Sequence, residues 1–311
     1  TVKYPNPEEA SAMRLALELG KKENADLVMG TDPDADRLGI AAPDKGEFKL
    51  VSGNQLGVLL ADYIFSSRKD TGRMPKKPAF IKSIVTSELQ TLIAKNYGAA
   101  TFDTLTGFKW IAGQMGNFET GADRYDFVFG DEESYGFLVN KDVRDKDAVS
   151  AATITAEMAL YHKSQGRTLW DQLRKIWSQY GYFQETLISK VFKGEAGLHT
   201  MNNLMEKIRS NPPATFAGQE VVVTKDYKDG TSFYTKVNSK RKDINLPSSN
   251  VIQFVLSDDS IVTARPSGTE PKIKFYASCR SKPGEPIEKA IEDVKKKIEG
   301  ISEALNRLIG E

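Results

Sequence analysis

The chain has 311 residues, of which 40% are hydrophobic and 27% charged, an ordinary globular composition with room for two or three domains. Its 43 basic and 42 acidic residues nearly cancel, so overall charge argues against nucleic acid or a membrane as a partner. Cys279 is the only cysteine, which excludes an intrachain disulfide framework and a zinc site built from cysteines. Without a signal-peptide profile or a run of about 18 apolar residues, a cytoplasmic location is expected.

Residues 1–70 read as a helix followed by strands and a second helix. Asn6 and Pro7 predict the first helix start, because asparagine is a good N-cap and proline suits the first helical position. The elements predicted after it are strands over 27–29, 38–42 and 48–52 and a helix over 55–65. The polar run 66–77 is interpreted as a linker. Helix followed by strand indicates the later part of an α/β domain whose first half lies outside the chain.

Residues 75–183 alternate between strands and helices, which is typical of a mostly parallel sheet covered by helices. The predicted strands are 79–85, 99–103 and 127–129, and the predicted helices are 87–97, 108–116, 146–165 and 169–180. The polar and glycine-flanked stretches between them are expected to be loops.

Residues 186–311 change to an α+β pattern with a largely antiparallel sheet. The predicted strands are 186–192, 219–226, 251–256, 260–265 and 272–279, with a helix over 198–210 and a long helix at the C-terminus. The polar run 236–249 is expected to be an exposed loop. In the last helix, apolar residues repeat every three or four positions from Ile287 to Leu308, and we interpret this as a helix lying on a sheet rather than a coiled coil.

Three aspartates, Asp32, Asp34 and Asp36, follow the strand at 27–29. Alternate side chains of an extended segment point the same way, so these carboxylates are expected to converge, and oxygen ligands of this density suit Mg²⁺. A calcium loop is excluded, because its glycine and glutamate positions are occupied by Arg37 and Pro43. The third aspartate disfavours a phosphatase with an aspartyl nucleophile, and a solvated acidic turn remains the alternative.

Two further loops carry polar chemistry. Residues 129–136 follow an apolar strand and place Glu132 and Ser134 where α/β sheets bind ligands, with acceptors for sugar hydroxyls. Residues 265–271 offer the guanidinium of Arg265, two hydroxyls and the N–H groups of a glycine turn, which suit a phosphate. An ordinary hairpin turn is the alternative for the second loop.

Together the three loops resemble those of the α-D-phosphohexomutase superfamily, in its phosphoglucomutase/phosphomannomutase family. Members share a D-x-D-x-D-R metal loop, a G-E-x-S-type sugar loop and an R-x-S-[GN]-T phosphate loop on separate domains, in the order found here. The resemblance implies an α/β fold: two phosphohexomutase-type domains, the first incomplete, with mixed, mostly parallel sheets, then an α+β domain with a largely antiparallel sheet. The implied bounds are 1–70 for the later part of domain 2, 75–183 for domain 3 and 186–311 for domain 4.

The resemblance also assigns roles to residues. Mg²⁺ would be held by the three aspartates, and the residues expected to be catalytic are Lys146, Arg37 and Lys82. The residues expected to bind substrate are Glu132, Ser134, Thr106, Gly107, Lys109, Arg265, Ser267, Gly268 and Thr269. A solvated surface lysine is the alternative for Lys146 and for Lys82.

The activity implied is interconversion of glucose 1-phosphate and glucose 6-phosphate, in carbohydrate metabolism, through a phosphoserine and glucose 1,6-bisphosphate. The family's T-[AS]-S-H-N-P loop carries that serine, but this chain contains no Ser-His pair. We therefore expect the phosphoserine domain to lie outside the chain, and the chain alone to be inactive. Pro33 and Asp131 place it in a glucomutase- or pentomutase-like branch, with phosphopentomutase, phosphomannomutase or a non-catalytic phosphosugar-binding fragment as alternatives.

Overall fold

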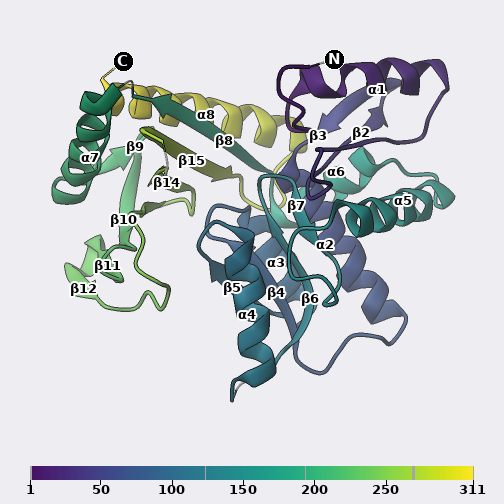
Figure 1. Cartoon of the computed structure of the whole chain (residues 1–311), viewed down its shortest axis with the longest axis horizontal. Helices are drawn as coiled ribbons and strands as arrows, with labels where there is room; N and C mark the ends of the chain where they lie inside the picture. Colours follow the sequence, from purple (N-terminus) through teal and green to yellow (C-terminus); the bar gives the residue numbers. More distant parts are fainter. Residues whose placement is uncertain (1, 123, 193, 268–269, 311) are drawn as a thin grey trace. The chain divides into compact units, whose positions relative to one another are not determined.

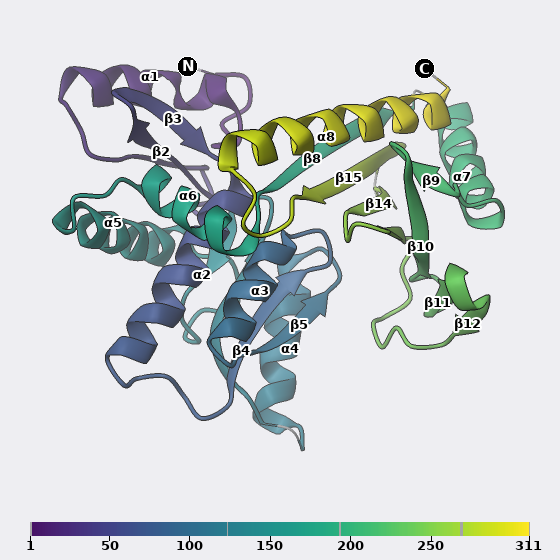
Figure 2. The same ribbon diagram turned by 180° about the vertical axis from the view of Figure 1, so that it is seen from behind.

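The computed structural model describes residues 2–122, 124–192, 194–267 and 270–310 and is drawn in Figures 1 and 2. The chain divides into two compact units, Thr1–Ile176 and Trp177–Glu311. None of the helices in the described ranges is long and apolar enough to cross a membrane.

The first unit begins with a small antiparallel sheet covered by a helix. Helix α1 (Ala10–Lys22) precedes strands β1 (Val28–Thr31), β2 (Leu38–Asp44) and β3 (Glu47–Val51), which pair in the order β1-β2-β3. Met13 of α1 packs on Val28 and Ala41, and this apolar contact fixes the helix on the sheet. The helix starts later than predicted, because the Asn6 side chain accepts from the Glu8 N–H at 3.1 Å in a preceding turn.

Helix α2 (Gly53–Asp70) is longer than the sequence predicted, so the first part of the expected linker at 66–77 is wrong. Ser52 starts the helix through a capping box with Gln55, in which each side chain accepts from the other residue's N–H, at 3.2 and 3.0 Å. Gly72, at φ +68°, follows the last turn. The polar composition of residues 66–70 therefore reflects an exposed helical end rather than a loop.

A second, mostly parallel sheet organises the rest of the first unit. Its strand order is β5-β4-β6-β7, with parallel pairing among the first three and an antiparallel last strand. The strands are β4 (Pro78–Ser83), β5 (Ala100–Thr104), β6 (Asp126–Glu132) and β7 (Gly136–Leu138), and the remaining helices are α3 (Glu88–Asn96), α4 (Phe108–Thr120), α5 (Ala148–Ser164) and α6 (Leu169–Tyr180).

Alternation along β4 explains why both faces of this sheet carry helices. Ala79 and Ile81 pack with Ile111 and Met115 of α4, whereas Phe80 points to the other face and meets the ring of Phe65 in α2 at 6.5 Å. The predicted α/β class with a mostly parallel sheet is confirmed for this part, although the β1-β2-β3 sheet is antiparallel throughout.

The second unit is an antiparallel sheet with two helices, as predicted. The strand order is β12-β11-β10-β13-β14-β15-β8, and β9 pairs with β10. The strands are β8 (Phe183–Val191), β9 (Thr215–Phe216), β10 (Gln219–Asp226), β11 (Thr231–Tyr234), β12 (Ser239–Arg241), β13 (Ile252–Leu256), β14 (Ile261–Pro266) and β15 (Lys272–Arg280). The helices are α7 (Gly194–Ser210) and α8 (Ile287–Ile309), with a 3₁₀ turn at Thr235–Val237.

Helix α8 lies along β8 and β15 (Figure 2), which confirms the interpretation of its apolar spacing. The face it buries consists of Ala290, Val294, Ile298, Ile301 and Leu305. The expected loop at 236–249 is wrong in its first part, because Ser239–Arg241 forms β12. A strand of Ser, Lys and Arg carries no apolar alternation, so this strand could not be predicted from periodicity.

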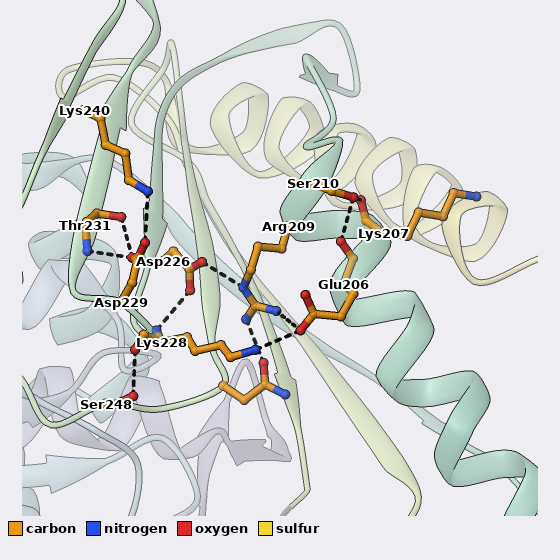
Figure 3. A network of polar contacts seen from close by, with 11 residues as sticks. Glu206, Lys207, Arg209, Ser210, Asp226, Lys228, Asp229, Thr231, Lys240 and Ser248 are labelled. Carbon is orange, nitrogen blue, oxygen red and sulfur yellow. Dashed lines mark hydrogen bonds and ion pairs between the residues drawn. The ribbon is translucent and has the colours of Figure 1, made fainter.

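A polar network ties the end of α7 to the hairpin region of this sheet (Figure 3). Arg209 donates from Nε to Asp226 at 2.8 Å, from Nη1 to Glu206 at 2.9 Å and from Nη2 to Asn250 at 2.7 Å. The side chains of Arg209 and Asp226 are each 16% exposed, so this pair is less screened than the surface pair of Lys240 with Asp229. Arg209 is therefore the residue that anchors α7 on β10.

Candidate functional site

The aspartate loop, residues 32–37, is a tight reversal between β1 and β2 and not an extended segment. Oδ1 of Asp32 accepts from the N–H groups of Asp36 and Arg37, each at 3.1 Å, and Ala35 has φ +55°. The alternation argument for three converging carboxylates is therefore wrong. Asp32 and Asp36 come close because the loop folds back, while Asp34 is exposed at its tip. Among the described residues, no three His, Cys, Asp or Glu side chains are already arranged around a metal position.

Asp32 and Asp36 nevertheless suit a divalent cation. Oδ1 of Asp36 is buried and accepts no hydrogen bond within the described ranges, so it retains lone pairs for a ligand. Arg37 Nε lies 3.9 Å from that atom and 3.7 Å from Oδ2 of Asp32. The guanidinium therefore lies beside both carboxylates at distances longer than a hydrogen bond. Carboxylate oxygens are the ligands that Mg²⁺ prefers.

Lys146 joins this loop to residues 129–136, the predicted sugar-binding loop, which is called the sugar loop below. Its Nζ lies 2.9 Å from Oδ2 of Asp36 and 5.6 Å from the centre of the Phe108 ring, and the side chain is only 16% exposed. Gly136 makes room for it, because a Cβ there would come within 2.2 Å of Lys146 Cδ. The solvated surface lysine considered for Lys146 is therefore excluded.

The charge state of Lys146 follows from its surroundings. Burial acts to lower its pKa, but the hydrogen bond and charge of Asp36, with Asp145 and Glu132 further off, raise the pKa above its ordinary value. Lys146 is therefore a positively charged group at neutral pH, held between the two loops.

Glu132 ends β6, which runs three residues further than predicted. Its Oε1 accepts from the N–H of Gly107 at 2.5 Å, and Gly107 is the N-cap of α4 with φ +115°. A carboxylate at the positive end of a helix is electrostatically favoured. The predicted residues Thr106 and Gly107 are half-buried beside it, while Lys109 is exposed with its Nζ 5.1 Å from the Trp110 ring centre.

Backbone contacts lock the aspartate loop onto the sugar loop. Leu38 donates from N to the Tyr135 carbonyl at 3.0 Å, and Arg37 forms an isolated bridge with Gly136. Ser134 is half-buried in the turn between β6 and β7, next to Tyr135 at φ +64°. The structure thus brings together the aspartate loop, Arg37, Lys146 and the sugar loop within the first unit.

Lys82 is placed differently from either prediction. Its side chain is 0% exposed, and its Nζ lies 2.8 Å from Glu88 and 3.0 Å from Asp103. Burial acts to lower its pKa, but Asp103 and Glu88 outweigh burial and raise it above the ordinary value. Lys82 is neither a solvated surface lysine nor accessible to a substrate in this structure, because its buried ammonium is held by Glu88 and Asp103, which are themselves partly exposed.

Sequence reasoning missed how the acidic run at 131–133 is anchored. Asp131 is fully buried and accepts from Gln90 Nε2 of α3 at 2.9 Å, and burial raises its pKa to about 8. Glu133 accepts from the Ser83 hydroxyl at 3.1 Å. With Glu132 on Gly107, three successive acids are tied to three different elements, so Glu132 is held rigidly. Consecutive acids after an apolar strand were the only signal of this arrangement.

The predicted phosphate loop belongs to the second unit. Arg265 pairs across the sheet with Lys274 in β14 and β15, and the N–H of Ser267 donates to the Lys272 carbonyl at 2.6 Å. Gly268 and Thr269, also predicted to bind substrate, lie outside the described residues. Two basic residues thus lie opposite each other on neighbouring strands where the loop begins. Like charges in this arrangement favour binding of an anion beside them.

Comparisons with known proteins agree with these features. The family model described as Phosphoglucomutase/phosphomannomutase, alpha/beta/alpha domain III matches residues 52–180, and the one for alpha/beta/alpha domain II matches residues 1–46. A phosphoglucomutase of Staphylococcus aureus strain USA300 is 40% identical over 281 residues, covering 90% of this chain and 49% of the relative. One from Staphylococcus epidermidis is 38% identical over 279 residues, with 89% and 50% covered.

A solved structure has the same fold. Pp63/parafusin from Paramecium, a phosphoglucomutase in its open form, superposes with a TM-score of 0.61 at 20% identity, over 99% of this chain and 51% of that chain. The chain spans about half the length of the curated relatives it matches.

Proposed function

The chain belongs to the α-D-phosphohexomutase superfamily, and from this we propose that it forms the metal-, sugar- and phosphate-binding part of a phosphoglucomutase. The proposed reaction is the interconversion of glucose 1-phosphate and glucose 6-phosphate through glucose 1,6-bisphosphate. The phosphoserine that supplies the phosphoryl group would lie on a segment outside these 311 residues. Cytoplasmic carbohydrate metabolism is the proposed setting.

One observation carries the proposal. The Asp36–Lys146 ion pair, at 2.9 Å, links two segments more than 100 residues apart that were assigned separately to metal binding and to catalysis. Asp36 keeps an unpartnered oxygen beside this pair, and Glu132 is fixed on the N-terminus of α4. A cation position, a charged ammonium and a rigid hydroxyl acceptor in one unit are what phosphoryl transfer to a sugar hydroxyl requires.

Each of these residues has a role in the proposed reaction. Lys146 holds its ammonium where the sugar hydroxyl gains or loses a proton and offsets the charge of the transferring group. Glu132 and Ser134 orient the sugar hydroxyls, with Thr106 and Lys109 of the neighbouring loop as further contacts. Arg37 adds positive charge beside the transferring group. Arg265 and Ser267 hold the phosphate that is not being transferred, through charge-assisted hydrogen bonds.

Mg²⁺ is the proposed metal, held by Asp32 and Asp36 with Asp34 as a third carboxylate. When bound, it would neutralise charge on the transferring phosphoryl group. Glucose is favoured over the mannose and pentose alternatives because the relatives at 38–40% identity are named phosphoglucomutases.

Mg²⁺ should bind weakly to the 311-residue chain and more tightly once a phosphoserine is supplied. Mg²⁺ is usually held by carboxylates together with a phosphate, and a phosphoserine would add oxygen ligands and roughly 1.5 to 2 negative charges at neutral pH. Calorimetric titration of the chain and of the phosphorylated and dephosphorylated longer protein compares the three. Asp36→Asn tests whether the aspartate loop is the site that is titrated. Its control is Asp26→Asn, which changes an exposed aspartate paired with Lys163. Equal affinity in all three proteins would refute the proposed role of phosphate in this site.

Binding of glucose 1-phosphate to the purified chain tests the proposed function directly. We expect Arg265→Ala to weaken it about ten-fold or more, because a charge-assisted hydrogen bond contributes roughly 1.5 to 3 kcal/mol. The matched control is Arg241→Ala, which removes another arginine from a strand of the same unit. Fluorescence or calorimetric titration gives the dissociation constant of glucose 1-phosphate for each protein. Identical affinity in the wild type and Arg265→Ala would mean that the 265–271 loop is only a hairpin.

A further inference from the structure

A cavity of about 320 Å³ lies in the first unit between α2 and α5, which contact each other. Both helices can be followed in Figure 2. The polar part of its wall consists of Tyr63, Ser67, Arg68, Arg73 and Glu157. This volume is at the lower end of the range found for small-molecule sites. None of these residues belongs to the proposed mutase site.

Two arginines in this wall have no carboxylate partner. Arg68 is half-buried, and within the described ranges no Asp or Glu forms an ion pair with Arg68 or Arg73; Arg73 Nε donates to the Thr71 hydroxyl at 3.0 Å. Burial, and then the neighbouring charge of Arg73, lower the pKa of Arg68 below its ordinary value. Arg68 is half-buried and Arg73 is exposed, and a partly buried positive charge next to a like charge is unfavourable unless an anion lies close to both.

Capping of α2 does not account for these arginines. The Ser67 carbonyl already accepts from the Thr71 N–H at 3.0 Å and the Thr71 hydroxyl at 2.6 Å, and the Arg68 carbonyl accepts from the Arg73 N–H at 2.8 Å. The carbonyl groups of the last turn are therefore satisfied without a guanidinium. Both guanidinium groups remain available to a ligand.

The cavity also offers hydroxyl-binding groups. Tyr63 donates its phenol hydrogen to Oε1 of Glu157 at 2.7 Å, and Ser67 lines the same cavity. This leaves Oε2 of Glu157 as an acceptor for a ligand hydroxyl. The two guanidinium groups outnumber the single carboxylate, so the cavity has a net positive charge.

We propose that this cavity is a second anion site, which binds a small phosphorylated metabolite that also carries hydroxyl groups. The phosphate would lie on Arg68 and Arg73, and the hydroxyls would lie on Glu157 and Ser67. The site is distinct from the mutase site: Gly53 at the start of α2 packs against the Glu133 carbonyl of the sugar loop, and Arg68 follows fifteen residues later, about 22 Å along the helix axis.

Arginine-selective modification of the wild-type chain by phenylglyoxal, read residue by residue by peptide mass spectrometry, locates the anion. We expect inorganic phosphate to protect Arg68 and Arg73, and glycerol 3-phosphate to protect them at a several-fold lower concentration. Potassium chloride at the same ionic strength should give no protection. Arg14, which is exposed and ion-paired with Glu18, is the internal control whose modification rate should not change. Arg265 in the same digest reports separately on the proposed phosphate loop.

Two variants sharpen the test. Arg68→Gln should raise the phosphate concentration that protects Arg73 by about ten-fold or more. Glu157→Gln should remove the advantage of glycerol 3-phosphate and leave protection by inorganic phosphate. Equal modification of Arg68 and Arg73 in phosphate and in chloride would overturn the anion site. Equal protection by the two phosphates would overturn the metabolite assignment.

Discussion

Replacing Lys146 by methionine in the proposed mutase, that is, in this chain joined to a phosphoserine-bearing segment, is expected to lower kcat/KM for glucose 1-phosphate by roughly 10²- to 10⁴-fold. Lys146 holds a positive charge 2.9 Å from Asp36, at the junction of the aspartate and sugar loops. Methionine keeps the apolar stem that packs beside Gly136 and Phe108 but removes the ammonium, so the loss should fall on kcat with little change in folding.

The matched control is Lys163→Met, which removes an ammonium that is 61% exposed and paired with Asp26 at 2.6 Å. Its kcat/KM should stay within about two-fold of the wild type, because exposed ion pairs contribute little. Formation of glucose 6-phosphate, measured in a coupled assay, gives kcat and KM for both variants. A loss of less than three-fold in Lys146→Met would remove Lys146 from the catalytic group.

Glu132→Gln should lower kcat/KM by about ten- to hundred-fold in both reaction directions. Glutamine keeps the shape of the side chain and an acceptor for the Gly107 N–H, so the change isolates the negative charge that binds sugar hydroxyls. The equilibrium constant fixes the ratio of kcat/KM in the two directions, so the shared contact is tested on KM. KM should rise for glucose 1-phosphate and for glucose 6-phosphate alike, because the bisphosphate presents its hydroxyls to the same carboxylate in either orientation.

Glu119→Gln is the control for this variant, since Glu119 is an exposed glutamate of α4 paired with Arg144. Forward and reverse rates are measured with glucose 1-phosphate and glucose 6-phosphate as separate substrates. A rise in KM for only one of the two substrates would show that Glu132 is not the shared hydroxyl contact.

Much of the fold could be read from periodicity. Helix Leu169–Tyr180 and strand Gln219–Asp226 have the bounds predicted for them, because each has a clear pattern and a marked end. The apolar repeat of α8 predicted most of the face that the helix buries, although Ile291 is exposed and Ala290 is buried in addition. Strands β11 and β12 were missed, since runs of four and three residues are too short to show a periodic pattern.

The site was harder to predict than the fold. The sequence predicted a role for the three aspartates, but their geometry depends on the reversal at Ala35, whose φ of +55° no spacing rule predicts for an alanine. The burial of Lys82 was hidden for a similar reason, because its partners Glu88 and Asp103 lie on neighbouring elements that only the fold brings together. The ion pair between Asp36 and Lys146 likewise arises from tertiary packing.

Conversion of glucose 1-phosphate to glucose 6-phosphate is the most direct measurement of the central claim. It is carried out in Mg²⁺ with a trace of glucose 1,6-bisphosphate, using the 311-residue chain alone and the same chain joined to a segment bearing the Ser-His-Asn-Pro-type loop. We expect no turnover above background from the chain alone and sustained turnover from the joined protein. Turnover by the chain alone would contradict the placement of the nucleophile outside these residues, and an inactive but folded joined protein would contradict the proposed reaction.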